Sequence, residues 1–129
     1  EGRILSKMTG DNTDATTNFI PKMGMQPLVR GYREVIQGIY SGRPYYQRVR
    51  NFLKDFNPRV KKRGSLNFIK FLALLKSIFI IGIFDRNRKY YWQLFFWSLL
   101  TRPRLFPLAI TYSIYGFHYQ RVFRKMNFF

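Results

Sequence analysis

The chain has 129 residues, of which 47% are hydrophobic and 19% aromatic, so it can build one small domain around one core and is not a disordered tail. It contains no cysteine, which excludes disulfides and thiolate metal sites. Its net charge of +17 favours polyanionic partners such as nucleic acid, anionic lipid or an acidic protein surface, but it says nothing about the fold.

The first segment of the chain is rich in polar and turn-forming residues, and it has neither a helical nor a strand period. Little of it can be buried to offset the entropy that is lost when a segment becomes ordered. We therefore predict an extended arm over residues 1–24 and a helical domain over residues 25–129.

Two adjacent amphipathic helices are predicted to follow the arm. Apolar residues recur at helical spacing over residues 28–40 and again over residues 45–56. Ser41 and Gly42 break the pattern, and Pro44 opens the second helix. Because the connection is so short, we expect the two helices to fold back as a hairpin that pairs their apolar sides. Their basic residues lie mostly off these stripes and should be solvated: Arg30, Arg33, Arg43, Arg48, Arg50 and Lys54.

The third predicted helix is unusually apolar. It is expected to run from an N-cap at Ser65 to about Gly82, with Lys70 and Lys76 as its charged residues. Apolar residues cover most of its circumference, so it either lies at the centre of its bundle or presses against an apolar partner. We expect one row of this helix to be partly exposed in the isolated domain and to form an apolar contact patch: Phe68, Phe71, Leu75 and Phe79.

The last two predicted helices are rich in aromatic residues. Either Asp85 or Asn87 is expected to cap the fourth helix, which should end before Pro103 because the residue that precedes a proline avoids helical angles. The fifth helix should begin near Pro103 or Pro107. The predicted fold is therefore all-α, with about five helices in a small bundle that follows the extended N-terminal arm.

No membrane-spanning segment is predicted. A spanning helix needs about 20 predominantly apolar residues, and the longest charge-free run, residues 105–120, contains Pro107, His118 and Gln120. Tryptophan and tyrosine beside unopposed arginine and lysine are typical of a surface that contacts lipid headgroups. The alternative interpretation is an aromatic core below a solvated basic face.

Residue types that carry catalysis are sparse. His118 is the only histidine, and no pair of residues has the spacing of metal ligands. Asp11 and Asp14 lie in a loop that does not match a calcium-binding pattern, and no glycine-rich phosphate loop is present. We therefore assign no catalytic, cofactor-binding or metal-binding residue to this chain.

Several short motifs occur in a fixed order along the chain. They are Thr17-Asn18-Phe19-Ile20-Pro21-Lys22-Met23, Gly31-Tyr32-Arg33, Ile39-Tyr40-Ser41, Tyr45-Tyr46-Gln47-Arg48-Val49, Arg102-Pro103-Arg104-Leu105-Phe106-Pro107-Leu108-Ala109-Ile110 and Tyr115-Gly116-Phe117-His118. As an ordered set they resemble the C-terminal region of cobalamin-binding radical S-adenosylmethionine (radical SAM) proteins, a family that includes the hopanoid methylases. The resemblance covers nearly the whole chain.

This resemblance implies a division of labour within a longer protein. In that family, three cysteines of a Cys-x-x-x-Cys-x-x-Cys motif hold an iron–sulfur cluster in a catalytic barrel, and cobalamin binds a separate N-terminal domain. The 4Fe-4S cluster, S-adenosylmethionine and cobalamin are therefore expected in N-terminal domains that are missing here. Residues 1–24 would link the barrel to a C-terminal accessory domain, residues 25–129, that caps the barrel, excludes water and shapes an apolar substrate site.

The resemblance also suggests partners and a reaction. The implied partners are the chain's own radical SAM barrel and cobalamin domain, and the implied reaction is methyl transfer, or another radical reaction, on an apolar or lipid-like substrate. The arm residues expected to reach the barrel or the substrate are Asn12, Thr17, Asn18 and Lys22. Alternatively, the arm is a plain linker that contains Asx-type turns.

Two other functions stay open at this point. One is a stand-alone basic helical module that binds nucleic acid, although no recognised nucleic-acid motif is present and no specific nucleic acid is expected as a partner. The other is a peripheral membrane-binding helical domain. The expected location is the cytoplasm, either free or peripheral to the inner face of the membrane.

Overall fold

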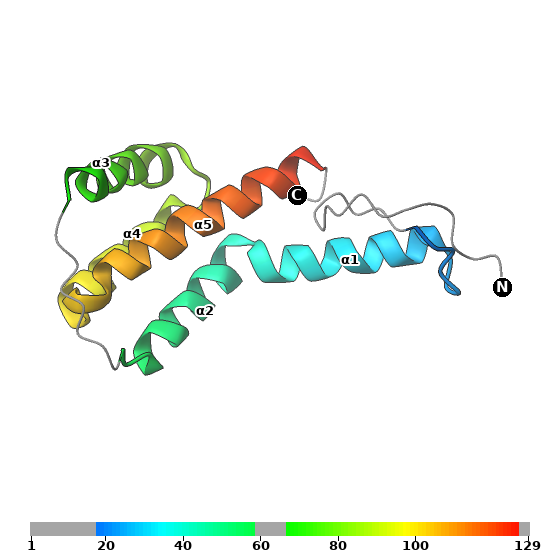
Figure 1. The fold of residues 1–129 in the computed structure, drawn as a ribbon, viewed down its shortest axis with the longest axis horizontal. Helices are drawn as coiled ribbons and strands as arrows, with labels where there is room; N and C mark the ends of the chain where they lie inside the picture. The colour runs from blue at the N-terminus through cyan, green and yellow to red at the C-terminus, as the bar shows by residue number, and fades with distance from the viewer. Residues whose placement is uncertain (1–17, 59–66, 127–129) are drawn as a thin grey trace.

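The computed structural model describes residues 18–58 and 67–126, and the regular elements of this part are all helical (Figure 1). The α-helices are α1 (Met25–Tyr40), α2 (Gly42–Asp55), α3 (Phe68–Ser77), α4 (Arg88–Thr101) and α5 (Phe106–Lys125). A π-helical segment, η1 (Ile78–Phe84), continues α3, and a short 3-10 helix, η2 (Pro103–Leu105), precedes α5. The prediction of an all-α fold with five helices is confirmed.

The core lies where α2, α4 and α5 meet. Its centre is Tyr91 of α4, which is fully buried and whose hydroxyl lies 3.0 Å from the Ser77 hydroxyl at the end of α3. On the α2–α5 side, the Tyr45 hydroxyl donates a hydrogen bond to the Tyr112 carbonyl at 2.6 Å. The buried apolar residues of this core are Tyr45, Tyr46, Val49, Leu53, Ile81, Tyr91, Leu94, Leu105, Ala109 and Ile110.

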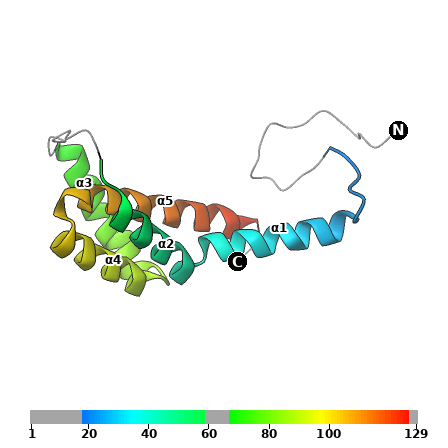
Figure 2. The same ribbon diagram turned by 90° about the horizontal axis from the view of Figure 1, so that it is seen from below.

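The prediction that the first two helices form a hairpin is wrong. Figures 1 and 2 show α2 continuing away from α1 beyond a bend, which lies at Ser41, the single residue between the two helices. The Ser41 backbone is extended (φ −65°, ψ 152°), and one extended residue does not reverse the direction of a chain. The apolar side of α2 packs on α4 and α5 instead.

Within the described part of the chain, the apolar side of α1 is fully buried only near its C-terminal end. There Ile36 packs with Phe123 of α5 in a second, smaller cluster of buried residues. One residue earlier in the sequence, Val35 is 57% exposed. The N-terminal half of α1 projects from the bundle (Figures 1 and 2).

The third helix departs from the regular helix that was expected. Ser65, the predicted N-cap, lies outside the described residues, and α3 begins directly after Asn67. From Ile78 onwards the helix widens into the π-helix η1, and Gly82 does not end it. The Gly82 carbonyl accepts a hydrogen bond from the indole nitrogen of Trp92 at 2.9 Å, and a Cβ atom at Gly82 would lie 3.0 Å from that indole ring. This glycine therefore lets α4 pack closely against the backbone of η1.

Of the two residues predicted to begin the fourth helix, Asn87 holds the N-cap position. Asp85 lies before it, and its carboxylate accepts a hydrogen bond from the Asn87 backbone N–H at 3.0 Å. The helix ends at Thr101, as the following Arg102-Pro103 pair predicts. Pro103 opens the 3-10 helix η2, so the fifth helix begins near Pro107, the second of the two predicted positions.

Candidate functional site

The outer side of α3 and η1 carries an exposed row of apolar side chains. Phe68, Phe71, Leu75 and Phe79 are 79%, 54%, 37% and 58% exposed, and their spacing places them along one side of the helix. We call this surface the outer apolar face and include in it the neighbouring exposed residues Leu72, Ile80, Ile83 and Phe84.

The outer apolar face is exposed because α3 packs on the bundle through its opposite side. Ser77 is buried there and bonds to the Leu74 carbonyl and to the Tyr91 hydroxyl of α4. A helix that is apolar around most of its circumference needs cover on more than one side, and the described residues cover only the inner one. The outer apolar face is a row of exposed large residues of the kind that marks interaction surfaces.

A second surface feature is a basic groove between α2 and α4. It has a volume of about 520 Å³ and is open to solvent. Arg43, Arg50 and Lys54 provide its cationic groups, and none of the described residues that line it is acidic. The other lining residues are Tyr46, Gln47, Asn51, Tyr90, Gln93 and Leu94. We call this feature the α2–α4 groove.

Aromatic rings hold two cations beside the α2–α4 groove. The Arg50 guanidinium lies 5.0 Å from the centre of the Trp97 ring. The Lys89 ammonium lies 4.9 Å from the centre of the Tyr90 ring. Such cation–π contacts contribute about 0.5–1 kcal/mol at exposed sites and fix the position of the charge.

Asp85, the acidic residue that precedes α4, forms an ion pair with Arg124. Asp85 is only 6% exposed, and its carboxylate lies 3.7 Å from the Arg124 guanidinium. Asn87 donates a side-chain hydrogen bond to Gln120 at 2.8 Å, and Gln120 donates one to the Tyr40 carbonyl at 2.7 Å. This buried network joins α4, α5 and the end of α1, and it leaves the α2–α4 groove without a carboxylate on its surface.

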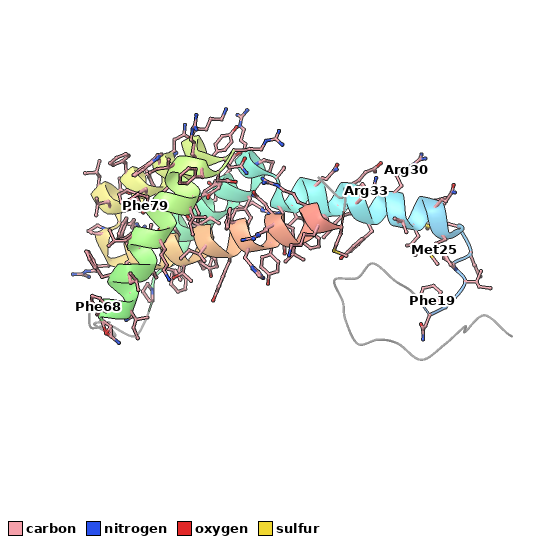
Figure 3. The ribbon with its side chains drawn as sticks, turned by 90° about the horizontal axis from the view of Figure 1, so that it is seen from above. Phe19, Met25, Arg30, Arg33, Phe68 and Phe79 are labelled. Carbon is pink, nitrogen blue, oxygen red and sulfur yellow. The ribbon has the colours of Figure 1, made fainter. Side chains whose placement is uncertain are left out.

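The described part of the predicted arm lies far from the outer apolar face. Asn12 and Thr17 are outside the described residues, Asn18 is half-buried, and Lys22 is exposed in the turn before α1. Figure 3 shows Phe68 and Phe79 at one end of the molecule, and Phe19 and Met25 at the other. The structure therefore does not bring Asn18 and Lys22 together with the predicted apolar patch.

The sequence contained a partial signal for the α2–α4 groove, which our sequence analysis did not use. Arg43, Gln47, Arg50 and Lys54 follow one another at helical spacing on one side of α2. These basic residues were expected simply to be solvated. The wall that turns them into a groove comes from α4, which lies more than thirty residues away in the sequence and packs there only because of the tertiary fold.

The residues of this chain do not fit an iron–sulfur cluster, because the sequence contains no cysteine to hold one. Over residues 18–58 and 67–126, the fold also brings no group of three histidine, aspartate or glutamate side chains together as metal ligands. We therefore derive no reaction step in this chain through a cluster, S-adenosylmethionine or cobalamin.

The described part of the chain contains five α-helices. None of its helices combines the length and the apolar character that crossing a bilayer requires.

The fold and its surfaces define a small, strongly basic, all-α domain with an outer apolar face and a basic groove. Comparison with protein families then places it: residues 1–128 match the family described as a domain of unknown function, DUF4070, and the chain belongs to that family. The match includes residues 1–24 and the five α-helices of the described part of the chain. No curated protein and no solved structure matches the chain.

Proposed function

We propose that this chain is the C-terminal accessory domain of a cobalamin-dependent radical SAM enzyme, and that its outer apolar face docks on the catalytic barrel. The observation that carries this proposal is the exposure of Phe68, Phe71, Leu75 and Phe79 on α3 and η1. The ordered motifs that resemble the C-terminal region of that family support the choice of partner.

The energy available from docking is substantial. Complete burial of a phenylalanine or leucine side chain stabilises a structure by about 1.5–3 kcal/mol relative to its exposed state. Four such residues on one side of α3 and η1 would therefore favour a covalently linked barrel, which loses less freedom on docking than a separate molecule does.

The point where the chain enters α1 constrains how the barrel would lie. Residues 18–24 lead into the N-terminal end of α1, whereas the outer apolar face lies at the opposite end of the molecule (Figures 1 and 3). A barrel that meets both must extend along α5, whose 20 residues correspond to about 30 Å of helix. In this arrangement the domain closes one side of the barrel, excludes water from the radical chemistry and shapes a site for an apolar or lipid-like substrate that is methylated there.

The first test is the gene itself. The reading frame upstream of Glu1 should encode a Cys-x-x-x-Cys-x-x-Cys motif in a barrel domain and, before it, a cobalamin domain. Absence of the three-cysteine motif from the full-length protein would refute this function.

The second test concerns the docking surface. In the full-length protein, the backbone amides of α3 should exchange hydrogen more slowly than in the 129-residue chain. Substitution of Phe68 and Phe71 by serine should remove this difference. Val35→Ser is the matched control, since Val35 is also exposed but lies on α1. Equal α3 exchange in the two proteins would show that the outer apolar face is not where the barrel binds.

A further inference from the structure

We infer that the α2–α4 groove binds the phosphate group of an amphipathic ligand, with the apolar part of that ligand lying on the exposed side of α4. This inference uses other helices than the docking proposal and does not depend on it. The chemistry in question is a phosphate ester joined to a hydrocarbon chain. Its source is either a headgroup in a membrane or a free amphiphile.

The cations of α2 are spaced for a phosphate. A helical rise of 1.5 Å per residue places Arg50 and Lys54 about 6 Å apart along the helix axis, and Arg43 about 10 Å before Arg50. The side chains of Arg50 and Lys54 are long enough to converge on one phosphate group, and both line the groove. An arginine beside a lysine combines a planar donor fork with a compact charge, which suits phosphate oxygens.

A third guanidinium stands near this end of the groove. Arg102, which follows α4, donates a hydrogen bond to the Lys54 carbonyl near the C-terminus of α2 at 2.5 Å. The C-terminal end of a helix disfavours an anion by about 0.3–1 kcal/mol. The charges of Arg50 and Lys54 outweigh this effect, and Arg102, which does not line the groove, satisfies one of the carbonyl groups that cause it.

Among the described residues that line the groove, none carries a carboxylate that could act as a counterion. Asp55 follows Lys54 directly, but a step of about 100° per residue turns it towards another side of α2, and it does not line the groove. Asp85 is buried and faces Arg124. Binding of an anion would therefore relieve repulsion between groups that the fold itself holds together.

The wall formed by α4 continues into apolar surface. Gln93, Phe96 and Leu100 lie at positions i, i+3 and i+7, so they follow one another along one side of α4. Gln93 lines the groove, whereas Phe96 is 53% exposed and Leu100 is 79% exposed. A ligand whose phosphate lies in the groove would place its hydrocarbon chain on these two side chains.

The aromatic residues of the groove favour an amphiphile over single-stranded nucleic acid. Proteins that bind single strands present open aromatic faces on which bases stack. Here Tyr46 is 6% exposed, and the Lys89 ammonium lies over the ring of Tyr90. Neither tyrosine provides such a platform.

Vesicle co-sedimentation of the protein tests the inference at physiological salt. Any protein with a charge of +17 binds anionic vesicles, so the comparison must be made between variants of equal charge. Arg50→Gln/Lys54→Gln changes the groove, and Arg30→Gln/Arg33→Gln removes two charges from α1, which Figure 3 shows projecting at the far end of the molecule. On vesicles of phosphatidylcholine with phosphatidic acid, we expect the groove variant to lose about tenfold in partitioning and the α1 variant to lose clearly less.

A second variant tests the apolar part of the site without a change of charge. Phe96→Ser/Leu100→Ser should weaken binding to the same vesicles several-fold, whereas Val35→Ser should not. Far-UV circular dichroism checks that each variant keeps its helix content. The inference would be overturned if the groove variant and the α1 variant lost vesicle binding equally. It would also be overturned if Phe96→Ser/Leu100→Ser lost none.

Two further probes identify the source of the ligand. Saturable binding of a short-chain, soluble phosphatidic acid that the Arg50→Gln/Lys54→Gln variant lacks would support the site and indicate a free amphiphile. Groove-dependent binding that is seen only on vesicles would support the site and indicate a membrane headgroup. Salt-resistant binding of a single-stranded oligonucleotide, lost in the same variant while vesicle binding is kept, would overturn the inference in favour of nucleic acid.

Discussion

A close contact between α2 and α5 can be tested with a single methyl group. Gly116 of α5 is buried, and a Cβ atom there would lie 2.3 Å from Cε1 of the Tyr45 ring and 2.7 Å from its Cζ. The ring is held in place, because its hydroxyl donates to the Tyr112 carbonyl at 2.6 Å and the side chain is only 8% exposed. Gly116→Ala must therefore displace the ring or separate the two helices.

The expected effect is a sum of three contributions. Overpacking of a well-filled core costs about 1–3 kcal/mol, and loss of the Tyr45 hydrogen bond costs about 0.5–1.5 kcal/mol. Replacement of a helical glycine by alanine returns about 1 kcal/mol through backbone entropy. We expect a net decrease of about 0.5–3.5 kcal/mol in the free energy of unfolding.

Urea denaturation followed by circular dichroism measures this change, and the chain contains its own controls. Gly31 and Gly38 also lie within a helix, α1, but a Cβ atom at either position would meet nothing within 4 Å. Gly31→Ala and Gly38→Ala should each raise the free energy of unfolding by up to about 1 kcal/mol. If Gly116→Ala stabilises the protein as these controls do, the packing of α2 on α5 through Tyr45 is incorrect.

Three further predictions concern buried polar groups. Gln120→Leu should destabilise the protein by about 1–3 kcal/mol, because it leaves the Tyr40 carbonyl and the Asn87 amide without their partner; urea denaturation measures this, and a change below 0.5 kcal/mol would argue against the network. Trp92→Phe removes the donor to the Gly82 carbonyl and should speed hydrogen exchange in η1, with unchanged exchange as the contrary result. Burial raises the pKa of Tyr45 from 10.0 to about 12, so the folded protein holds this proton more tightly than the unfolded chain; the stability it contributes is complete below pH 10 and is lost as pH rises to 12. Tyr45→Phe should therefore reduce the loss of stability between pH 10 and pH 12 by up to about 2–3 kcal/mol, and an unchanged pH dependence of urea denaturation would contradict this assignment.

Local signals were sufficient to locate the helices. The break at Ser41 and the stop before Pro103 act through backbone geometry within a few residues, and the structure has helix ends at both. The expectation that α3 carries more apolar surface than its neighbours cover also followed from local information, because it needs only the periodicity of one segment. Phe68, which is 79% exposed, is part of the apolar surface that the neighbouring helices leave uncovered.

Local sequence signals did not predict which helices pack against each other. The hairpin prediction assumed that helices adjacent in sequence cover each other, whereas α2 found its partners in α4 and α5 and left most of α1 projecting. The same limit explains why Gly116 and Gly82 could not be told apart from Gly31 and Gly38. Only the first two have a neighbouring ring against the backbone.

The amino-acid sequence by itself thus determined the helical class, most helix ends and the apolar character of α3, because these depend on backbone preferences and on periodicity within one element. The tertiary structure decided which helices pair, where η1 widens to admit Trp92, and that Arg50 and Lys54 face α4 across a groove. These features depend on contacts between residues far apart in the chain. Such contacts are selected by how side chains of different helices fill one core, which no single stretch of sequence contains.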